Sequence, residues 1–188
     1  MQLENLQAVA NRVYLRHLER EDAKGPYHQW INDSEVTRFL VTRLGHQSVE
    51  AIECYIQEMN DQHDEIMLAV CDKDTDCHIG NVKLQHIDSA HRTAWLSVVI
   101  GTRGNWGRGV GTEAIALMTA IGFDELGLRR IDASCFAENM GVQRAFEKCG
   151  YMQEGRTRNQ YFAEGKCWDA VRLGILQKDP ALWRDFIT

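Results

Sequence analysis

Apolar and polar residues recur along this chain with two different periods, and each period predicts one type of element. Residues 92–101 alternate in the manner of a strand, with Leu96, Val98 and Ile100 on one side. Residues 65–72 are nearly all apolar and are expected to form a central strand. Further strands are expected at 12–18, at 78–87 with Gly80 as a bulge, at 129–136, and at 155–163 and 167–176, joined as a hairpin at Glu164 and Gly165.

Other segments repeat their apolar residues every three or four positions, which predicts helices. One helix is expected from Thr112 to Leu126, ended by Gly127. Ser48 and Asn139 are each placed to cap the first turn of a further helix. Shorter helical pieces are expected at 21–33, 34–40 and 180–187. Strands come first and then alternate with helices, an order that indicates an α/β or α+β domain around a mixed sheet.

Composition and charge narrow the class of protein. The 188 residues are 44% hydrophobic, carry a net charge of −6 and have a pI near 5.6, which argues against a nucleic-acid partner. No apolar run approaches the roughly 20 residues that cross a bilayer, so no membrane partner is expected. The six cysteines and seven histidines lack metal-ligand spacing, which predicts no metal and reduced thiols. We therefore expect a cytoplasmic protein.

A glycine-rich segment, "GNWGRGVGTEA" at 104–114, lies between a predicted strand and a predicted helix. The first turn of a helix has backbone N–H groups without partners, and glycines let an anion approach them closely. Arg103 and Arg108 add positive charge. The segment lacks the Lys-Ser/Thr of a P-loop and the glycine spacing of a dinucleotide fold. It predicts a phosphate site, with a simple connecting turn as the alternative.

The surrounding motifs resemble the GNAT superfamily of acyl-CoA-dependent N-acetyltransferases. The resemblance covers residues 79–155, and this stretch is most similar to the branch of ribosomal-protein alanine N-acetyltransferases. It implies a single-domain GNAT fold over 1–188, with its core at 9–178 and a twisted mixed sheet of about six or seven strands flanked by helices. The matching pieces, in family order, are "IG" at 79–80, "WGRGVGTEA" at 106–114, "LRRI" at 128–131, "EN" at 138–139 and "FEKCGY" at 146–151.

The same resemblance implies acetyl-CoA as the co-substrate. Backbone amides from Arg108 to Thr112 would hold its pyrophosphate, although Trp106 stands where the family has Gln or Arg. The end of the preceding strand would pair with the pantetheine arm and polarise the thioester carbonyl. Asn139 would contact the cofactor arm, or serve only as a helix cap. The predicted cofactor-binding residues are Val98, Val99, Ile100, Arg103, Arg108, Gly109, Val110, Gly111, Thr112 and Asn139.

The proton-transfer groups do not follow from the resemblance. Phe146 stands where many relatives have a tyrosine, and Trp95 stands where others have a glutamate. By placement, Ser134, Glu138 and Tyr161 are the catalytic candidates, whereas Cys135 is in phase with the apolar residues of its strand and is assigned to packing. The predicted acceptor side consists of Trp30, Asn32, Asp33 and Trp95.

The predicted activity is acetyl transfer to a primary amine by direct attack on the thioester. A protein N-terminal α-amine is the first choice of acceptor, since its pKa near 8 leaves an appreciable fraction neutral at pH 7. Amino sugars, polyamines and antibiotic amines remain alternatives, as do a non-catalytic acyl-CoA-binding module and a phosphate-binding domain for another nucleotide. A homodimer is also left open.

Overall fold

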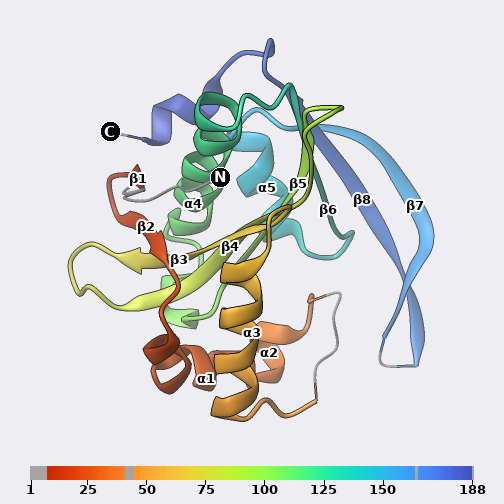
Figure 1. The fold of residues 1–188 in the computed structure, drawn as a ribbon. Helices are drawn as coiled ribbons and strands as arrows, with labels where there is room; N and C mark the ends of the chain where they lie inside the picture. Colours follow the sequence, from red (N-terminus) through yellow and green to blue (C-terminus); the bar gives the residue numbers. More distant parts are fainter. Residues whose placement is uncertain (1–7, 41–44, 164, 188) are drawn as a thin grey trace.

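A twisted sheet runs through the whole molecule (Figure 1). The computed structural model describes residues 8–40, 45–163 and 165–187. Within these residues the sheet has eight strands in the order β1-β2-β3-β4-β5-β6-β8-β7. The strands are β1 (Ala8–Val9), β2 (Val13–His17), β3 (Ile66–Asp72), β4 (His78–Asp88), β5 (Thr93–Ile100), β6 (Arg130–Phe136), β7 (Met152–Ala163) and β8 (Lys166–Leu176).

All seven predicted strands are present. The eighth, β1, was not predicted because two residues are too short to show any periodicity. The predicted bulge lies one residue before Gly80, since Val70 pairs with Gly80 and Cys71 pairs with His78. Gly80 itself is needed for a close approach, because a Cβ atom there would lie 2.2 Å from the carbonyl oxygen of Val99. Of the hairpin turn, Gly165 has a positive φ of 74°, whereas Glu164 lies outside the described residues.

β5 and β6 pair only over a short distance and then separate. They are the parallel neighbours in an otherwise antiparallel sheet, and their register covers Thr93–Arg130, Ala94–Ile131 and Trp95–Asp132. Each strand continues to pair on its other side, β5 with β4 as far as Ile100 and β6 with β8 as far as Phe136. The second half of β5 therefore has an edge with no strand beside it, facing the opening between the two strands.

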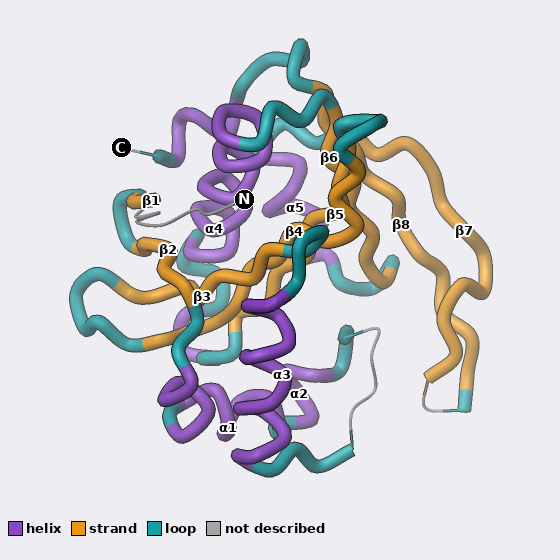
Figure 2. Tube along the Cα trace, in the orientation of Figure 1, coloured by secondary structure: helices purple, strands orange, loops and turns teal. Residues whose placement is uncertain are grey.

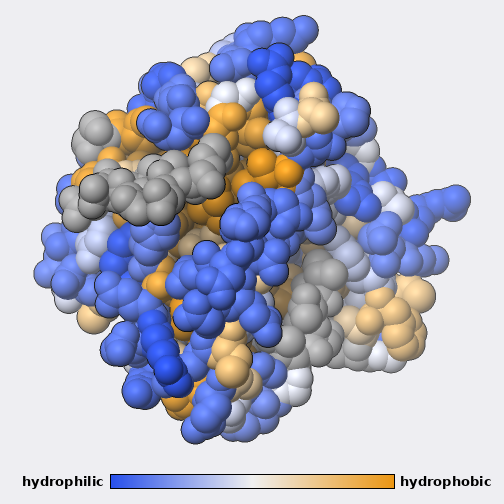
Figure 3. All heavy atoms as spheres, viewed as in Figure 1, coloured by the Kyte–Doolittle hydropathy of each residue, from blue (hydrophilic) through white to orange (hydrophobic). Residues whose placement is uncertain are grey.

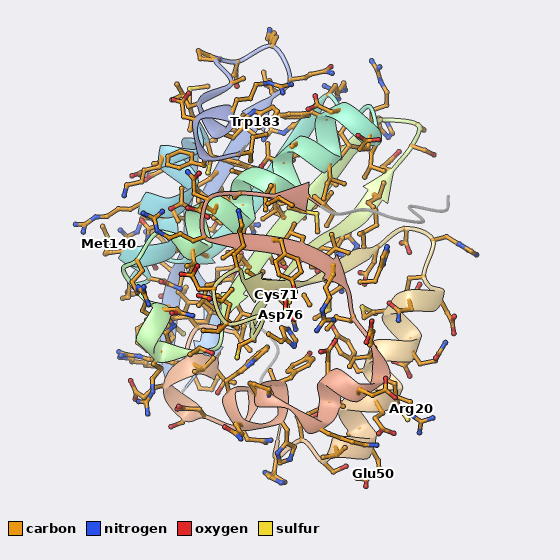
Figure 4. The ribbon with its side chains drawn as sticks, turned by 90° about the vertical axis from the view of Figure 1, so that its left-hand side faces the viewer. Arg20, Glu50, Cys71, Asp76, Met140 and Trp183 are labelled. Atoms are coloured by element: carbon orange, nitrogen blue, oxygen red, sulfur yellow. The ribbon has the colours of Figure 1, made fainter. Side chains whose placement is uncertain are left out.

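Helices cover the two faces of the sheet in separate groups (Figure 2). One face packs against α4 and α5, together with the short turn η4, whose Trp183 lies beside the α4 layer in Figure 4. The other face packs against α1, α2 and α3. The bounds are η1 (Arg20–Lys24), α1 (Pro26–Ile31), α2 (Ser34–Thr37), α3 (Val49–Asp61), η2 (Arg103–Asn105), α4 (Val110–Ala120), η3 (Ile121–Glu125), α5 (Met140–Lys148) and η4 (Leu182–Phe186).

Both predicted N-caps are confirmed. Ser48 accepts a hydrogen bond from the backbone N–H of Ala51 at 3.2 Å, and Asn139 accepts one from Val142 at 3.4 Å. The predicted helix over 112–126 begins two residues earlier than expected, at Val110. Its C-terminal end is confirmed, because the chain continues through a wider π-helical turn to Glu125 and Gly127 follows with φ of +62°. Gly122 lies in that turn, where a Cβ atom would meet the Ile131 side chain at 2.6 Å. Close packing against β6 thus requires glycine there.

The remaining helical segments are shorter than expected. Residues 21–33 divide at Gly25, after which Pro26 starts α1 in the position where proline costs no hydrogen bond. Residues 34–40 are helical only as far as Thr37, and the C-terminal segment is a 3-10 turn. None of the described helices has the length and apolar character needed to cross a bilayer. The face shown in Figure 3 is mainly hydrophilic, with hydrophobic residues in patches between.

Candidate active site at the opening between β5 and β6

The loop before α4 presents backbone N–H groups to the opening. Gly109 is the N-cap of α4, with φ of +86°, and it has no side chain to cap the helix. The first bond inside the helix runs from the N–H of Glu113 to the carbonyl of Gly109 at 3.1 Å. The N–H groups of Val110, Gly111 and Thr112 therefore have no hydrogen-bond acceptor within the helix. The helix dipole adds partial positive charge around them. This end of α4 fits an anion.

Two of the four loop glycines are required by backbone conformation. Gly107 and Gly109 have φ of +73° and +86°, a region that residues with a side chain rarely adopt. Gly104 and Gly111 have no positive φ, although a Cβ atom at Gly111 would touch Ile100 at 3.6 Å. The loop thus turns sharply at two points just before the helix.

A buried carboxylate holds the start of α4 against β2. Glu113 is 1% exposed and accepts hydrogen bonds from the guanidinium of Arg12 at 2.6 Å and from the backbone N–H of Arg12 at 2.8 Å. The N–H of Val13 also donates to it at 3.3 Å. Sequence reasoning did not predict this contact. The available signal was the position of Glu113 in the first turn of the helix, where a negative charge interacts favourably with the helix dipole.

One pocket of about 480 Å³ lies at this end of α4, and we call it the loop pocket. It is bounded by the end of β5, the glycine loop and α5. Three cationic side chains also line it: Arg38, Arg144 and Lys148. Its described lining contains one carboxylate, that of Glu35. This excess of positive charge suits a polyanion. The predicted residues that line it are Val98, Val99, Ile100, Gly109, Val110, Gly111, Thr112 and Asn139.

The two predicted loop arginines lie outside both pockets. Arg103 forms an ion pair with Asp33, with Nε 3.3 Å from Oδ2, and Arg108 donates to Oδ1 of Asn105 at 3.3 Å. The expectation that they face the anion does not fit this geometry. The basic residues of the loop pocket come instead from the end of α2 and from α5. Arg144 and Lys148 could have been found, because residues four apart share one face of a helix.

Trp106 fastens the loop to the end of β5. Its indole N–H donates to the carbonyl of Ile100 at 2.8 Å, and its side chain lines the loop pocket while remaining 46% exposed. Trp106 thus positions the loop at the place where family members have Gln or Arg.

A second pocket of about 640 Å³ lies on the face of the sheet covered by α1 to α3, and we call it the sheet pocket. The two pockets share lining residues on the separated half of β5. Among the predicted residues, Trp30, Trp95, Ser134 and Tyr161 line the sheet pocket. The residues that line both pockets are Phe39, Leu40, Val98, Val99, Asn139 and Val142.

Hydroxyl groups from two separate strands meet in the sheet pocket. Ser134 Oγ on β6 lies 3.0 Å from Tyr161 Oη on β7, and the Tyr161 ring stacks on Phe136 at 4.4 Å. Glu138 lies in an exposed turn and lines neither pocket, so the structure does not bring it together with the other two candidates. Phe146 is buried and lines the sheet pocket, without a group that could carry a proton.

The thiol in the sheet pocket is protonated at neutral pH. Cys135 is 8% exposed and packs with Ile131 and Ala133, which confirms its predicted place in the core. Burial raises the pKa of this thiol to about 11. A thiolate nucleophile is therefore scarce at pH 7, which disfavours an acetyl-cysteine intermediate.

The predicted acceptor wall divides into two groups. Trp30 is buried, stacks on Tyr27 with ring centroids 4.5 Å apart, and lines the sheet pocket. Asn32 is occupied within the protein, since its amide exchanges hydrogen bonds with the backbone of Gln47 at 2.8 and 3.0 Å. Asp33 caps α2 by accepting from Glu35 at 2.9 Å. Neither Asn32 nor Asp33 lines the loop pocket or the sheet pocket, so the structure does not bring them together with Trp30 and Trp95.

Comparison with known proteins agrees with this geometry. The family model described as "Acetyltransferase (GNAT) domain" matches residues 12–152. Spermidine N(1)-acetyltransferase of Escherichia coli K12 is 30% identical over 168 residues, covering 89% of this chain and 88% of that protein. Alpha/beta-tubulin-N-acetyltransferase 9 of Homo sapiens is 27% identical, covering 80% and 77%. The Vibrio cholerae spermidine N-acetyltransferase, solved with CoA and spermine, superposes with a TM-score of 0.80 at 26% identity, covering 88% and 96%.

The chain therefore belongs to the GNAT family of N-acetyltransferases, and its acetyl donor is acetyl-CoA. The described residues fit this donor, because the loop pocket combines free N–H groups at a helix N-terminus with three cationic side chains. The resemblance to the family is confirmed, while the ribosomal-protein branch stays a prediction. Among the residues that the structure describes, no group of three or more His, Cys, Asp or Glu side chains is placed to hold a metal.

Proposed function

We propose that this enzyme acetylates an α-amine, in the first instance the N-terminus of a protein or peptide, bound in the sheet pocket. The observation that carries the proposal is the charge of that pocket. Its described lining contains Lys83 and Arg172 and no Asp or Glu side chain. A polyamine brings two or more positive charges, whose desolvation needs carboxylates in the protein. An acceptor with a single amine fits this lining better.

The protonation state of the amine supports the same acceptor. Attack on a thioester needs a neutral amine, and no carboxylate of the described pocket lining is placed to deprotonate it. At pH 7 roughly one tenth of an α-amine with a pKa near 8 is neutral, against less than about one in a thousand for a lysine-type amine with a pKa near 10.4. An α-amine can therefore react with little help from a general base.

The reaction is a direct transfer. The amine nitrogen forms a bond to the thioester carbon, the carbon–sulfur bond breaks, the amine loses a proton and the leaving thiolate gains one. In this proposal the free edge of β5 from Val98 to Ile100 pairs with the pantetheine arm, and the N–H groups at the start of α4 hold the pyrophosphate. Asn139 lines both pockets while its Oδ1 accepts from Val142, so it can contact the cofactor arm through its amide.

Tyr161 and Ser134 are the proposed route for the proton. Their hydroxyls are hydrogen-bonded at 3.0 Å, and both residues line the sheet pocket beside β5. We expect Tyr161→Phe to lower kcat about 10- to 100-fold with little change in KM, and to alter the pH dependence of kcat. Tyr55→Phe removes a hydroxyl from the same pocket and should leave kcat within about twofold. Unchanged kinetics in Tyr161→Phe would assign the proton transfers to water.

The acceptor is tested by mass spectrometry. Purified protein with acetyl-CoA is incubated with peptides bearing a free N-terminus, the same peptides with a blocked N-terminus and an internal lysine, spermidine, and amino sugars. We expect an acetyl mass increase on the free N-terminus and none on the blocked peptides. Acetylation of spermidine without acetylation of any α-amine would overturn the proposal. If no acceptor gains mass while acetyl-CoA binds, the chain is a non-catalytic acyl-CoA-binding module.

A further inference from the structure

We infer that the acceptor carries an acidic group close to its amine, and that Arg172 binds this group. The inference rests on the proposed function and names the chemical class of its acceptor. The group is a carboxylate, supplied either by an acidic side chain at the first or second residue of a peptide or by the α-carboxylate of a free amino acid.

Arg172 lies in the sheet pocket without an acidic partner. It is on β8, where it pairs in register with Ser134 of β6, and its guanidinium lies 5.4 Å from the centre of the Trp95 ring. Its guanidinium donates a hydrogen bond to the side-chain amide oxygen of Gln160 at 3.5 Å, at the limit for such a bond. No carboxylate of the described chain forms an ion pair with it. A guanidinium that lies over an indole ring at this distance keeps its N–H donors free for a planar anion.

Three neighbouring cations, unlike Arg172, are paired with carboxylates. Arg130 on β6 pairs with Asp132 and Glu154, and Arg156 on β7 pairs with Asp169 at 2.7 Å. Lys83, the other cation of the pocket lining, has its Nζ 2.5 Å from Glu65. These carboxylates are each engaged by another cation, which leaves Arg172 as the charge available to a ligand.

The position of Arg172 places the bound carboxylate near the reacting amine. Trp95, whose ring lies beside the Arg172 guanidinium, is three residues before Val98 on β5, and Val98 begins the edge where the thioester arm is proposed to lie. Three residues of strand span about 10 Å. A carboxylate on the first or second residue of a peptide can bridge this distance.

The test compares acidic acceptors with their neutral amides. Peptides that have Asp or Glu at position 1 or 2 are paired with peptides that have Asn or Gln there, and free amino acids are paired with their α-carboxamides. We expect wild-type kcat/KM to be at least about tenfold higher for the acidic member of a pair. If the difference in kcat/KM appears in the peptide pairs, the bound group is a side-chain carboxylate. If it appears in the pairs of free amino acids, the bound group is the α-carboxylate.

Arg172→Gln should remove this preference, mainly through KM, and Arg172→Glu should favour peptides with Lys at the same position. Arg158→Gln is the matched control, because Arg158 is an exposed arginine on the same hairpin and lines neither pocket. Thermal melting shows whether these variants are folded. If they fold poorly, Arg172→Lys is used instead, because it keeps the positive charge while removing the planar guanidinium. Equal rates on acidic and neutral α-amine acceptors would overturn this inference alone, whereas no acetylation of any α-amine would overturn the proposed function.

Discussion

Gly109→Val is expected to weaken acetyl-CoA binding at least about 30-fold, because it changes the loop that holds the pyrophosphate. Gly109 has φ of +86° at the N-cap of α4, and a β-branched residue is a severe outlier there. Such a residue costs about 1–3 kcal/mol unless the backbone moves. A Cβ atom itself would fit, since its nearest neighbour is the Arg12 guanidinium at 3.7 Å. The backbone is therefore the source of the effect: relaxing φ turns the N–H groups of 110–112 away from the loop pocket.

The measurement is the dissociation constant of CoA by calorimetry, together with a thermal melt to show that the protein is folded. Gly104→Val is the matched control on the same loop, because Gly104 has no positive φ and a Cβ atom there meets nothing within 4 Å. We expect it to bind CoA within about twofold of wild type. Equal CoA affinity of Gly109→Val and Gly104→Val would mean that the pyrophosphate is bound elsewhere.

Glu113→Ala is expected to lower the free energy of unfolding by about 2–4 kcal/mol, since it removes the acceptor of several donors at once. The backbone N–H groups of Arg12 and Val13 lose their shared carboxylate oxygen, and α4 loses its link to β2. The exposed Arg12 guanidinium, with 57% of its side chain accessible, can be hydrated instead and adds little. The cost therefore comes mainly from buried backbone donors without partners.

Urea denaturation measures this loss. Glu113→Gln keeps an acceptor oxygen for the two N–H groups and should lose clearly less stability than Glu113→Ala. Glu147→Ala removes an exposed glutamate from α5 and should change the unfolding free energy by less than about 0.5 kcal/mol. If all three variants unfold at the same urea concentration as wild type, the Glu113 anchor contributes nothing to stability.

Local patterns predicted most elements of this protein. The alternation of Leu96, Val98 and Ile100 identified β5, and two side chains that cap helices identified the starts of α3 and α5. The errors fall where a tertiary contact outweighs local preference. The helical pattern after Ala120 continues in the sequence, but packing of Gly122 against Ile131 accompanies a wider turn. Strand β1 is defined by its pairing with β2, and its two residues are too few to predict a strand from sequence.

The site was predicted in the same uneven way. The glycine loop was predicted as an anion site from a short contiguous motif, and the role of the end of β5 was implied by the family resemblance; both lie beside the loop pocket and stay predictions. Arg103 and Arg108 were assigned to the anion by their nearness in sequence, yet their side chains are held by Asp33 and Asn105. Side-chain direction depends on neighbours from other elements, which the motif does not contain.

By itself, the sequence determined the order of strands and helices, since each element is encoded in residues that are adjacent or regularly spaced. The family and its acetyl donor followed from the resemblance of contiguous motifs to the GNAT superfamily. Only the tertiary structure decided which side chains meet in the sheet pocket. Ser134, Tyr161 and Arg172 come from three strands, and Trp95 from a fourth. They converge because β5 and β6 separate after three paired residues, and pairing between strands that are distant in sequence depends on the whole fold.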